Sequence, residues 1–265
     1  MDNAESHIYK SLIPEINRIS IEAGLKILEV YHSDLDFGVE AKADDSPLTI
    51  ADKQANDIIV KGLEALDHQF PIISEENKLL DYADRKHYDH FWLVDPLDGT
   101  KEFIKKNGEF TVNIALVKGN QAVLGVVYTP VTKELFYAYK NGGAFKSIEG
   151  EVTQIHANKF STSDADLRVI CSRSHLNDET QAFVDALTTP QLVSKGSSLK
   201  FLMLAEGKAE LYPRIAPTME WDTGAAQIIL EEAGGSVLQY GKTEPLAYNK
   251  ENLLNPFFVA SANQE

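Results

Sequence analysis

Apolar positions follow a helical spacing in the first quarter of the chain. Over residues 7–32 they recur every three or four positions, which predicts an amphipathic helix. The same spacing predicts a second helix over residues 50–66. Two short apolar runs follow, at residues 71–74 and 91–95, and each is expected to form a strand. The chain is therefore expected to open with two helices and to continue into a sheet.

The middle and the end of the chain show two further patterns. Three runs rich in β-branched and aromatic residues, with asparagine and glycine between them, predict antiparallel strands at residues 110–118, 122–128 and 134–140. Beyond residue 155, strand and helix patterns alternate. A strand is expected at residues 167–172, and helices are expected at residues 179–187, 197–205 and 220–233. The glycine pair at 234–235 would end the last helix.

This change of pattern divides the chain in two. Residues 1–155 predict an N-terminal α+β domain, and residues 156–265 predict a C-terminal α/β domain. The chain has 265 residues, 43% of them hydrophobic and 25% charged, which is a globular composition with enough length for a sizeable core.

Composition also excludes several classes of function. Forty acidic residues against 25 basic ones give a net charge of −15, which disfavours binding to long nucleic acids. No run approaches the roughly 18 apolar residues of a membrane span, and the acidic start does not resemble a secretory signal. The lone Cys171 excludes an internal disulfide framework and a cysteine-based zinc site. We therefore expect a cytoplasmic protein whose ligand is a small anion, with bound cations offsetting the local acidity.

The strongest chemical signal follows the apolar run at residues 91–95. Asp95 and Asp98 lie three positions apart with Pro96 between them, which fixes the backbone. Carboxylates held this way can bind hard divalent cations, and the Leu97 carbonyl is a further candidate ligand. Considered alone, the segment is equally compatible with an ordinary Asp-Gly turn after a strand.

The next two residues predict a phosphate-binding position. Gly99 allows a close approach of the backbone, and Thr100 could begin a short helix. Backbone N–H groups at such a start can receive a phosphate.

Three further acidic positions have structural as well as functional interpretations. Glu75, in the Ser74-Glu75-Glu76 segment, could complete a metal site beside Asp95, or could belong to an acidic start of a following helix. Asp222 is expected in the first turn of the helix at 220–233, where a plain capping role needs no function. Asp52 could orient a water molecule, or could pair with Thr49 in a capping box.

Together these segments suggest two-metal phosphoryl transfer with a water nucleophile. The sequence has no nucleotide-binding Gly-x-x-x-x-Gly-Lys loop, no Gly-x-Ser-x-Gly serine elbow and no His-Glu-x-x-His zinc motif. A phosphomonoesterase that depends on Mg²⁺ is therefore the best interpretation of the residues themselves.

At this point the chain resembles a known family. The Asp95–Thr100 segment and the Trp221-Asp222 pair resemble the lithium-sensitive, Mg²⁺-dependent inositol monophosphatase superfamily, and within it the bacterial 3′(2′),5′-bisphosphate nucleotidases. The narrower resemblance rests on residues 93–104, 107–113, 172–175, 196–201 and 211–214. It implies a layered αβαβα sandwich of the inositol monophosphatase and fructose-1,6-bisphosphatase type, with the active site between its two halves.

The resemblance also implies a substrate and a ligand set. The substrate would be adenosine 3′,5′-bisphosphate, a by-product of sulfate assimilation, and two or more Mg²⁺ ions would be bound in each active site. One Mg²⁺ would be held by Glu75, Asp95 and the Leu97 carbonyl. The second would be held by Asp95, Asp98 and Asp222.

The remaining roles are implied in the same way. Asp52 and Thr100 would orient and deprotonate the attacking water. Gly99 and Thr100 would bind the scissile phosphate. The nucleotide side would be formed by His175, Ser197, Lys200 and Arg214. Without the resemblance, the expectation for Arg214 and Lys200 is a surface arginine and a solvated helical lysine. The full substrate-binding set implied is Glu75, Leu97, Asp98, Gly99, Thr100, His175, Ser197, Lys200, Arg214 and Asp222.

Three hypotheses follow. The first is a nucleotidase that removes the 3′-phosphate of nucleoside bisphosphates and also accepts the sulfated nucleotide PAPS. The second is a sugar or inositol monophosphatase on the same metal site. The third is a catalytically silent sensor of metals or nucleotides, against which the full set of carboxylates argues. Peripheral contact with the cytoplasmic face of the inner membrane is a further implication of the resemblance, although no basic or amphipathic segment demands it.

Overall fold

Two long helices cover one face of the larger sheet, as their apolar spacing predicts. They are α1 (Asn3–Tyr31) and α2 (Ile50–Glu64). Their inward side chains, such as Ile16 and Ile59, are fully buried in one hydrophobic cluster with the central strands. The structure is a computed structural model that describes residues 3–33, 37–41, 47–171 and 177–265.

The larger sheet has seven strands in the order β3-β4-β5-β6-β7-β8-β9. Only the β3–β4 pair is parallel, and each of the other neighbouring pairs is antiparallel. Central strands β5 and β6 are buried on both faces, which explains why both are almost continuously apolar in sequence. The strands are β3 (Ile72–Ser74), β4 (His90–Asp98), β5 (Thr111–Lys118), β6 (Gln121–Thr129), β7 (Glu134–Tyr139), β8 (Gly143–Ile148) and β9 (Glu151–Ile155).

A second, five-stranded sheet is formed by the last hundred residues. Its order is β12-β11-β13-β15-β14, with β12, β11 and β13 parallel and the other two strands antiparallel to their neighbours. Its strands are β11 (Arg168–Cys171), β12 (Gln191–Ser194), β13 (Leu211–Arg214), β14 (Ser236–Gln239) and β15 (Phe258–Ser261). Two small pairs and one short helix complete the strands and connections: β1 (Glu40–Ala41) with β2 (Pro47–Leu48), β10 (Lys159–Phe160) with β16 (Asn263–Gln264), and α3 (Tyr82–Arg85).

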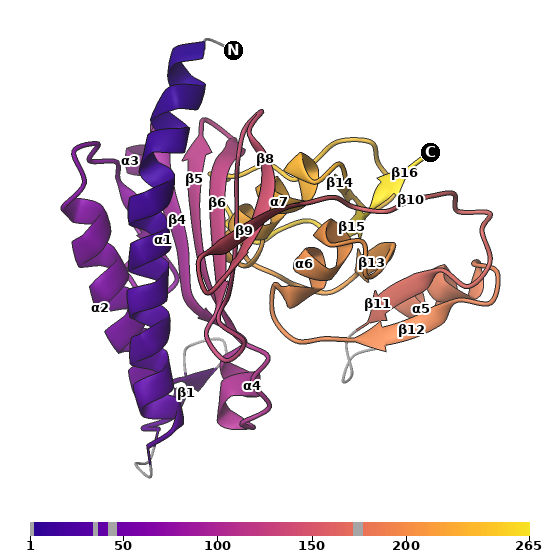
Figure 1. Ribbon diagram of the computed structural model, residues 1–265, viewed down its shortest axis with the longest axis horizontal. Coiled ribbons are helices and arrows are strands. Elements are labelled where there is room, and N and C mark those ends of the chain that lie inside the picture. The colour runs from indigo at the N-terminus through magenta and orange to yellow at the C-terminus, as the bar shows by residue number, and fades with distance from the viewer. Residues whose placement is uncertain (1–2, 34–36, 42–46, 172–176) are drawn as a thin grey trace.

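Helices α6 (Leu199–Ala205) and α7 (Gly224–Glu232) lie between the two sheets (Figure 1). Helix α7 contacts strands β5 to β8, and α6 contacts β13 and β15. Helix α5 (Asp178–Asp185) covers the outer face of the smaller sheet, where Val184 packs with Val169 and Leu211. The order of layers is therefore helix, sheet, helix, sheet, helix, which confirms the αβαβα prediction.

The secondary structure differs from the prediction in several respects. Strands β8 and β9 lie outside the predicted elements, and β9 shows no apolar alternation because most of its side chains are exposed. Strands β12, β14 and β15 of the smaller sheet are also absent from the prediction. The predicted helix at 220–233 is divided into a 3₁₀ turn, η1 (Glu220–Asp222), and α7. The division occurs at Thr223, whose hydroxyl donates a hydrogen bond to the Glu220 carbonyl.

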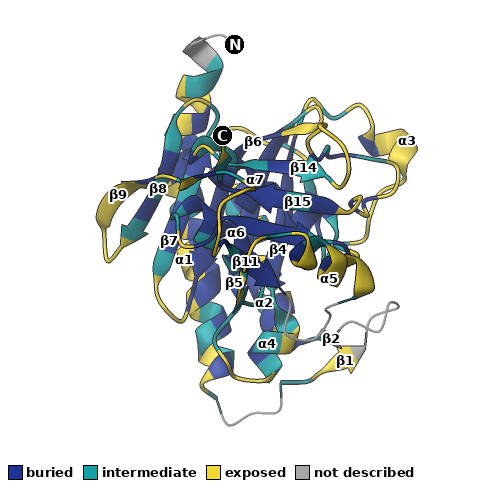
Figure 2. Ribbon diagram, turned by 90° about the vertical axis from the view of Figure 1, so that its right-hand side faces the viewer, coloured by how far each residue is buried: buried dark blue, intermediate teal, exposed yellow. Residues whose placement is uncertain are grey.

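The buried interior crosses both sheets and the helices between them (Figure 2). One hydrophobic cluster contains Leu93 of the larger sheet, Ile229 of α7 and Phe258 of the smaller sheet. The larger sheet ends at residue 155 and the smaller one begins at residue 168, but they share this core. The division into two domains at residue 155 stays a prediction. Among the described helices, none has the length and apolar character needed to cross a membrane.

The contact between α7 and β6 depends on Gly125. A Cβ at this position would lie 2.3 Å from the Ala225 carbonyl oxygen and 2.5 Å from the Ile228 side chain. We expect Gly125→Ala to lower the free energy of unfolding by roughly 1–3 kcal/mol, because the helix must move away from the sheet. Urea denaturation measures this loss. Gly119→Asn, in open space at a left-handed position that asparagine tolerates, is the control and should change little.

Candidate active site

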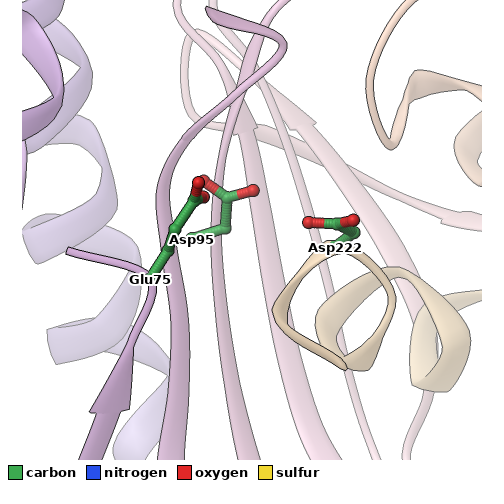
Figure 3. Close-up of side chains that lie close together, drawn as sticks. All are labelled: Glu75, Asp95 and Asp222. Carbon is green, nitrogen blue, oxygen red and sulfur yellow. The ribbon is translucent and has the colours of Figure 1, made fainter. Parts of the chain in front are cut away.

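Three carboxylates meet at one end of the larger sheet. Ligand oxygens of Glu75, Asp95 and Asp222 all lie within 4.8 Å of one another. Figure 3 shows the Glu75 and Asp95 carboxylates side by side, with Asp222 opposite them on its own turn of helix. Residues almost 150 positions apart in the sequence are thus brought into one cluster.

The parallel pairing of β3 and β4 places the first two carboxylates together. Ser74 pairs with Val94 in this register, and the next backbone N–H, that of Glu75, donates to the Val94 carbonyl at 3.1 Å. Glu75 therefore leaves its strand beside Asp95. The alternative in which Glu75 begins a helix is wrong, since residues 75 and 76 form a turn.

Asp222 reaches the cluster from the C-terminal half. It ends η1 instead of lying inside a long helix, and its Oδ2 accepts a hydrogen bond from the Met219 backbone N–H at 2.9 Å. Gly224 follows at the start of α7, where a Cβ would lie 3.0 Å from the Leu93 side chain. This close packing of small residues lets the turn approach strand β4.

Burial and mutual repulsion act on these carboxylates. Burial raises the pKa of Asp95 well above its usual range, and the negative charges of its neighbours, Glu75 first, raise it further. Burial, followed by the charge of Asp98, raises the pKa of Asp222 to about 8. Three close carboxylates are expensive to ionise together unless a cation neutralises them.

This donor set fits a hard divalent cation. It consists of oxygen ligands alone, and Asp95 is only 2% exposed, so its charge has little access to water. Mg²⁺ and Ca²⁺ prefer oxygen ligands, whereas zinc sites usually include histidine or cysteine. The inositol monophosphatase resemblance and this geometry both lead us to expect a metal at these three residues.

An irregularity in β4 positions the Leu97 carbonyl. The pairing of β4 with β5 shifts between Asp95 and Asp98, around Pro96. The Leu97 backbone N–H donates to Asp95 Oδ1 at 3.1 Å, and the Leu97 carbonyl accepts from the Thr100 hydroxyl at 3.2 Å. The carbonyl thus points toward the segment that follows, and its role as a metal ligand stays a prediction.

Gly99 and Thr100 form the expected turn into a short helix, α4 (Thr100–Ile104). Gly99 has φ +95°, and a Cβ there would lie 3.0 Å from the Glu109 carbonyl oxygen and 3.2 Å from Ser197 Cβ. Glycine is thus required both by the backbone angle and by the contact between the two halves of the chain.

Asp52 has the capping role that its sequence allows, and its carboxylate also contacts Thr100. Its Oδ2 accepts from the Thr49 backbone N–H at 2.7 Å, and Thr49 Oγ1 accepts from the Ala51 N–H, which is the predicted capping box. Its Oδ1 accepts from the Thr100 hydroxyl at 3.1 Å. Capping therefore fixes Asp52 in place, and the same carboxylate reaches the active-site threonine.

Asp98 is held by a polar network that sequence patterns alone do not indicate. Its Oδ2 accepts from the Ser198 backbone N–H and, at 3.4 Å, from the Asn113 amide. Ser198 Oγ in turn donates to Asn113 Oδ1 at 2.9 Å and lies 2.7 Å from the hydroxyl of Thr111. These three partners are almost fully buried, so Asp98 joins the larger sheet to the start of α6.

A cleft opens beside Asp98 and Asp222. It lies between the sheets and is lined by Asp98, Ser197, Ser198, Lys200, Phe201, Tyr212, Arg214, Thr218, Asp222, Thr223 and Phe258. Three of the four nucleotide-side residues expected from the sequence thus face one space. The fourth, His175, lies outside the described residues.

The two cationic side chains that line this cleft are each held by hydrogen bonds. Lys200 is 9% exposed, donates to the Ser197 carbonyl at 2.9 Å and has its Nζ 5.6 Å from the centre of the Tyr212 ring. Burial lowers the pKa of Lys200 to about 8, although the charge of Asp98 opposes this shift. Arg214 donates through one guanidinium nitrogen to the Pro217 carbonyl at 2.8 Å. Its Nε is buried and has no hydrogen-bond partner among the described residues.

Comparison with known proteins identifies the family. A model of the inositol monophosphatase family matches residues 10–264. The chain belongs to the inositol monophosphatase family. The resemblance predicted from the Asp95–Thr100 segment is confirmed.

Within the inositol monophosphatase family, the chain is similar to proteins named 3′(2′),5′-bisphosphate nucleotidase CysQ. Identity to that of Salmonella typhimurium is 44% over 249 residues, 93% of this chain and 98% of the relative. Identity to that of Escherichia coli K12 is 42% over 251 residues, 94% of this chain and 99% of the relative. The crystal structure of CysQ from Bacteroides thetaiotaomicron matches with a TM-score of 0.83 and 44% identity, covering 97% of this chain and 98% of that one.

The raised pKa of Asp222 predicts that the metal-free protein loses stability as the pH rises. A carboxyl whose pKa is raised on folding contributes its full stability below the unfolded pKa, and this contribution is lost as the pH passes the folded one. For Asp222 the window runs from 3.8 to about 8. Thermal unfolding in chelator should therefore show a midpoint that falls across this range.

Comparison with Asp222→Asn isolates this contribution from the general acidity of the chain. The variant cannot ionise, so its midpoint should fall less steeply with pH than that of the wild type. Asp57→Asn, at an exposed position on α2, should keep the wild-type slope. Equal slopes for all three proteins would contradict the assignment.

Proposed function

We propose that this protein is a 3′(2′),5′-bisphosphate nucleotidase that hydrolyses adenosine 3′,5′-bisphosphate to AMP and inorganic phosphate, with Mg²⁺ as its cofactor. The observation that carries the proposal is the cluster of three carboxylates beside a cleft lined by Lys200 and Arg214. A substrate with two phosphates needs a metal site for the reacting one and cationic donors for the other. The similarity to the CysQ proteins supports the same substrate class.

The metal ligands would be divided between two positions. Glu75, Asp95 and the Leu97 carbonyl would hold one Mg²⁺, and Asp95, Asp98 and Asp222 would hold the second. When bound there, Mg²⁺ would supply positive charge to the phosphate oxygens and would lower the pKa of a water molecule. The short distances within the carboxylate cluster and the raised pKa values of Asp95 and Asp222 support a bound cation here, and the division between two positions follows the family resemblance.

The chain's own residues would then handle the nucleophile and the phosphate. The Thr100 hydroxyl lies 3.1 Å from Asp52 Oδ1. It would contact the attacking water, accept the proton of that water and pass its own proton to the Asp52 carboxylate. The backbone N–H groups of Gly99 and Thr100 and the Thr100 hydroxyl would orient the scissile phosphate, since no side chain blocks the backbone at Gly99. Attack of the water oxygen at phosphorus would break the P–O3′ bond and form inorganic phosphate. The departing 3′-oxygen would take a proton from solvent, so that AMP leaves with a 3′-hydroxyl.

The nucleotide would lie in the cleft beside α6. The buried Nε of Arg214 is a donor without a partner among the described residues, and it would be satisfied by a phosphate oxygen. Lys200 and Ser197 line the same cleft, and we assign His175 to this side as well. Action on PAPS, a role in sulfate assimilation and a cytoplasmic location complete the proposal. Peripheral contact with the inner membrane stays a prediction.

The substrate assignment predicts a pattern of phosphate release. We expect rapid, Mg²⁺-dependent release from adenosine 3′,5′-bisphosphate that chelator abolishes and Li⁺ inhibits, with much slower release from inositol 1-phosphate. A phosphate assay with both substrates measures the ratio. Comparable release from inositol 1-phosphate would move the protein to the sugar or inositol monophosphatases, and release from neither would favour the sensor.

Arg214 separates nucleotide binding from the metal chemistry. We expect Arg214→Ala to raise the KM for adenosine 3′,5′-bisphosphate roughly 10- to 100-fold with a smaller effect on kcat, because a hydrogen bond from a charged donor contributes about 1.5–3 kcal/mol. Steady-state kinetics at saturating Mg²⁺ measures both constants. Arg18→Ala, on the exposed side of α1, is the control. An unchanged KM in the Arg214 variant would refute its assigned role.

A further inference from the structure

The η1 turn contains a second carboxylate, that of Glu220, which is fully buried and does not belong to the cluster of Glu75, Asp95 and Asp222. Glu220 is 0% exposed and comes two residues before Asp222. Its Oε2 accepts from the Asn249 backbone N–H at 2.7 Å, and its Oε1 accepts from the Lys250 N–H at 3.0 Å and from Lys250 Nζ at 2.5 Å. A buried glutamate with this many donors fixes the turn to the loop at residues 248–251.

The same loop is anchored to the N-terminal half of the chain. Arg85, in α3, donates to Asn249 Oδ1 at 2.9 Å and to the Glu251 carbonyl at 2.8 Å. The Asn249 side-chain amide donates back to the Arg85 carbonyl at 2.9 Å. Asn249 has φ +58°, a left-handed conformation that asparagine adopts more readily than most residues. Arg85 belongs to the connection between β3 and β4, which also contains Glu75.

The loop at residues 248–251 therefore connects the two sides of the carboxylate cluster. On one side is the connection with Glu75, which Arg85 ties to Asn249 and Glu251. On the other side is η1 with Asp222, which Glu220 ties to Asn249 and Lys250. Residues 248–251 also contact the larger sheet, where the Tyr248 N–H donates to the Asn120 carbonyl at 3.1 Å.

A buried ion pair is weak evidence for stability, because desolvation offsets its attraction. The effect of the Glu220–Lys250 pair on the position of Asp222 is more direct. The Asp222 carboxylate must stay within ligand distance of Glu75 and Asp95 although the three repel one another. Residues that hold a ligand in place change metal affinity even though they do not touch the metal.

We propose that Glu220 and Lys250 are positioning residues, which hold Asp222 against Glu75 and Asp95 and thereby set the affinity of the site for a divalent cation. The inference rests on the metal site of the proposed function. It predicts that loss of the Glu220–Lys250 pair weakens Mg²⁺ binding by about 10- to 100-fold, the usual effect of removing a residue that supports a metal ligand.

The test is titration of the full-length, metal-free protein with Mg²⁺ alone, monitored by calorimetry. Tryptophan fluorescence is a second readout, since one of the two tryptophans, Trp221, adjoins Asp222. The variants are Lys250→Met, Lys250→Arg and Glu220→Gln. The Lys250 variants decide the matter if Glu220→Gln does not fold, because the Lys250 side chain is 29% exposed.

The matched control is Lys146→Met. Lys146 also forms ion pairs with glutamates and is more buried than Lys250, with Nζ 2.5 Å from Glu134 and 2.7 Å from Glu206. These partners lie on β7 and directly after α6, and neither belongs to the carboxylate cluster. The variant therefore reports what loss of a buried ion pair does through stability alone. Its Mg²⁺ affinity should equal that of the wild type.

The outcomes separate the inference from the proposed function. Weaker Mg²⁺ binding in Lys250→Met, with recovery in Lys250→Arg and none of this loss in Lys146→Met, would support the positioning role. Wild-type affinity in Lys250→Met, or an equal loss in Lys146→Met, would overturn it while leaving the metal site intact. A wild-type protein that does not bind Mg²⁺ would overturn the proposed metal site, and the inference with it.

Discussion

Repulsion among Glu75, Asp95 and Asp222 is the constraint on which the rest of this structure depends. Carboxylates within 4.8 Å of one another, one of them almost inaccessible to water, would separate or stay protonated unless the fold held them and a cation neutralised them. The fold holds these carboxylates in place, because parallel strands set Glu75 beside Asp95 and the Met219 N–H binds one oxygen of Asp222. Stability is thus given up locally for a site that binds a cation.

The layered architecture determines how this cluster meets its substrate. The larger sheet supplies two of the three carboxylates and the turn at Gly99, whereas the helices and strands of the C-terminal half supply Asp222 and the cations of the cleft. Contacts between the N-terminal and C-terminal halves, such as the hydrogen bond from the Ser198 N–H to Asp98, fix the position of these two groups of residues relative to each other. The carboxylate cluster and the cleft are therefore joined by hydrogen bonds between the two halves of the chain, and such fixed placement suits a reaction that depends on orientation.

Much of this arrangement could be predicted from the sequence, because local patterns determine it. The apolar spacing predicts α1 and α2, and the Asp95–Thr100 segment predicts the family and supplies candidate metal ligands. What could not be predicted depends on contacts between distant residues. The break at Thr223 depends on hydrogen bonds within η1 and on close packing against β4, and β9 has too few buried positions to show a pattern. Asn113 and Glu220 are ordinary polar residues in the sequence. Only the fold shows that Asn113 donates to Asp98 and that Glu220 accepts from Asn249 and Lys250.

The most direct test of the account is a crystal of the protein soaked in Mn²⁺, which has similar oxygen-ligand preferences to Mg²⁺ and gives an anomalous signal. The account predicts an anomalous peak between Glu75, Asp95 and Asp222, within bonding distance of all three side chains or of a water that they hold. A fully soaked crystal with no peak at these residues would contradict the central claim that their repulsion is balanced by a bound cation.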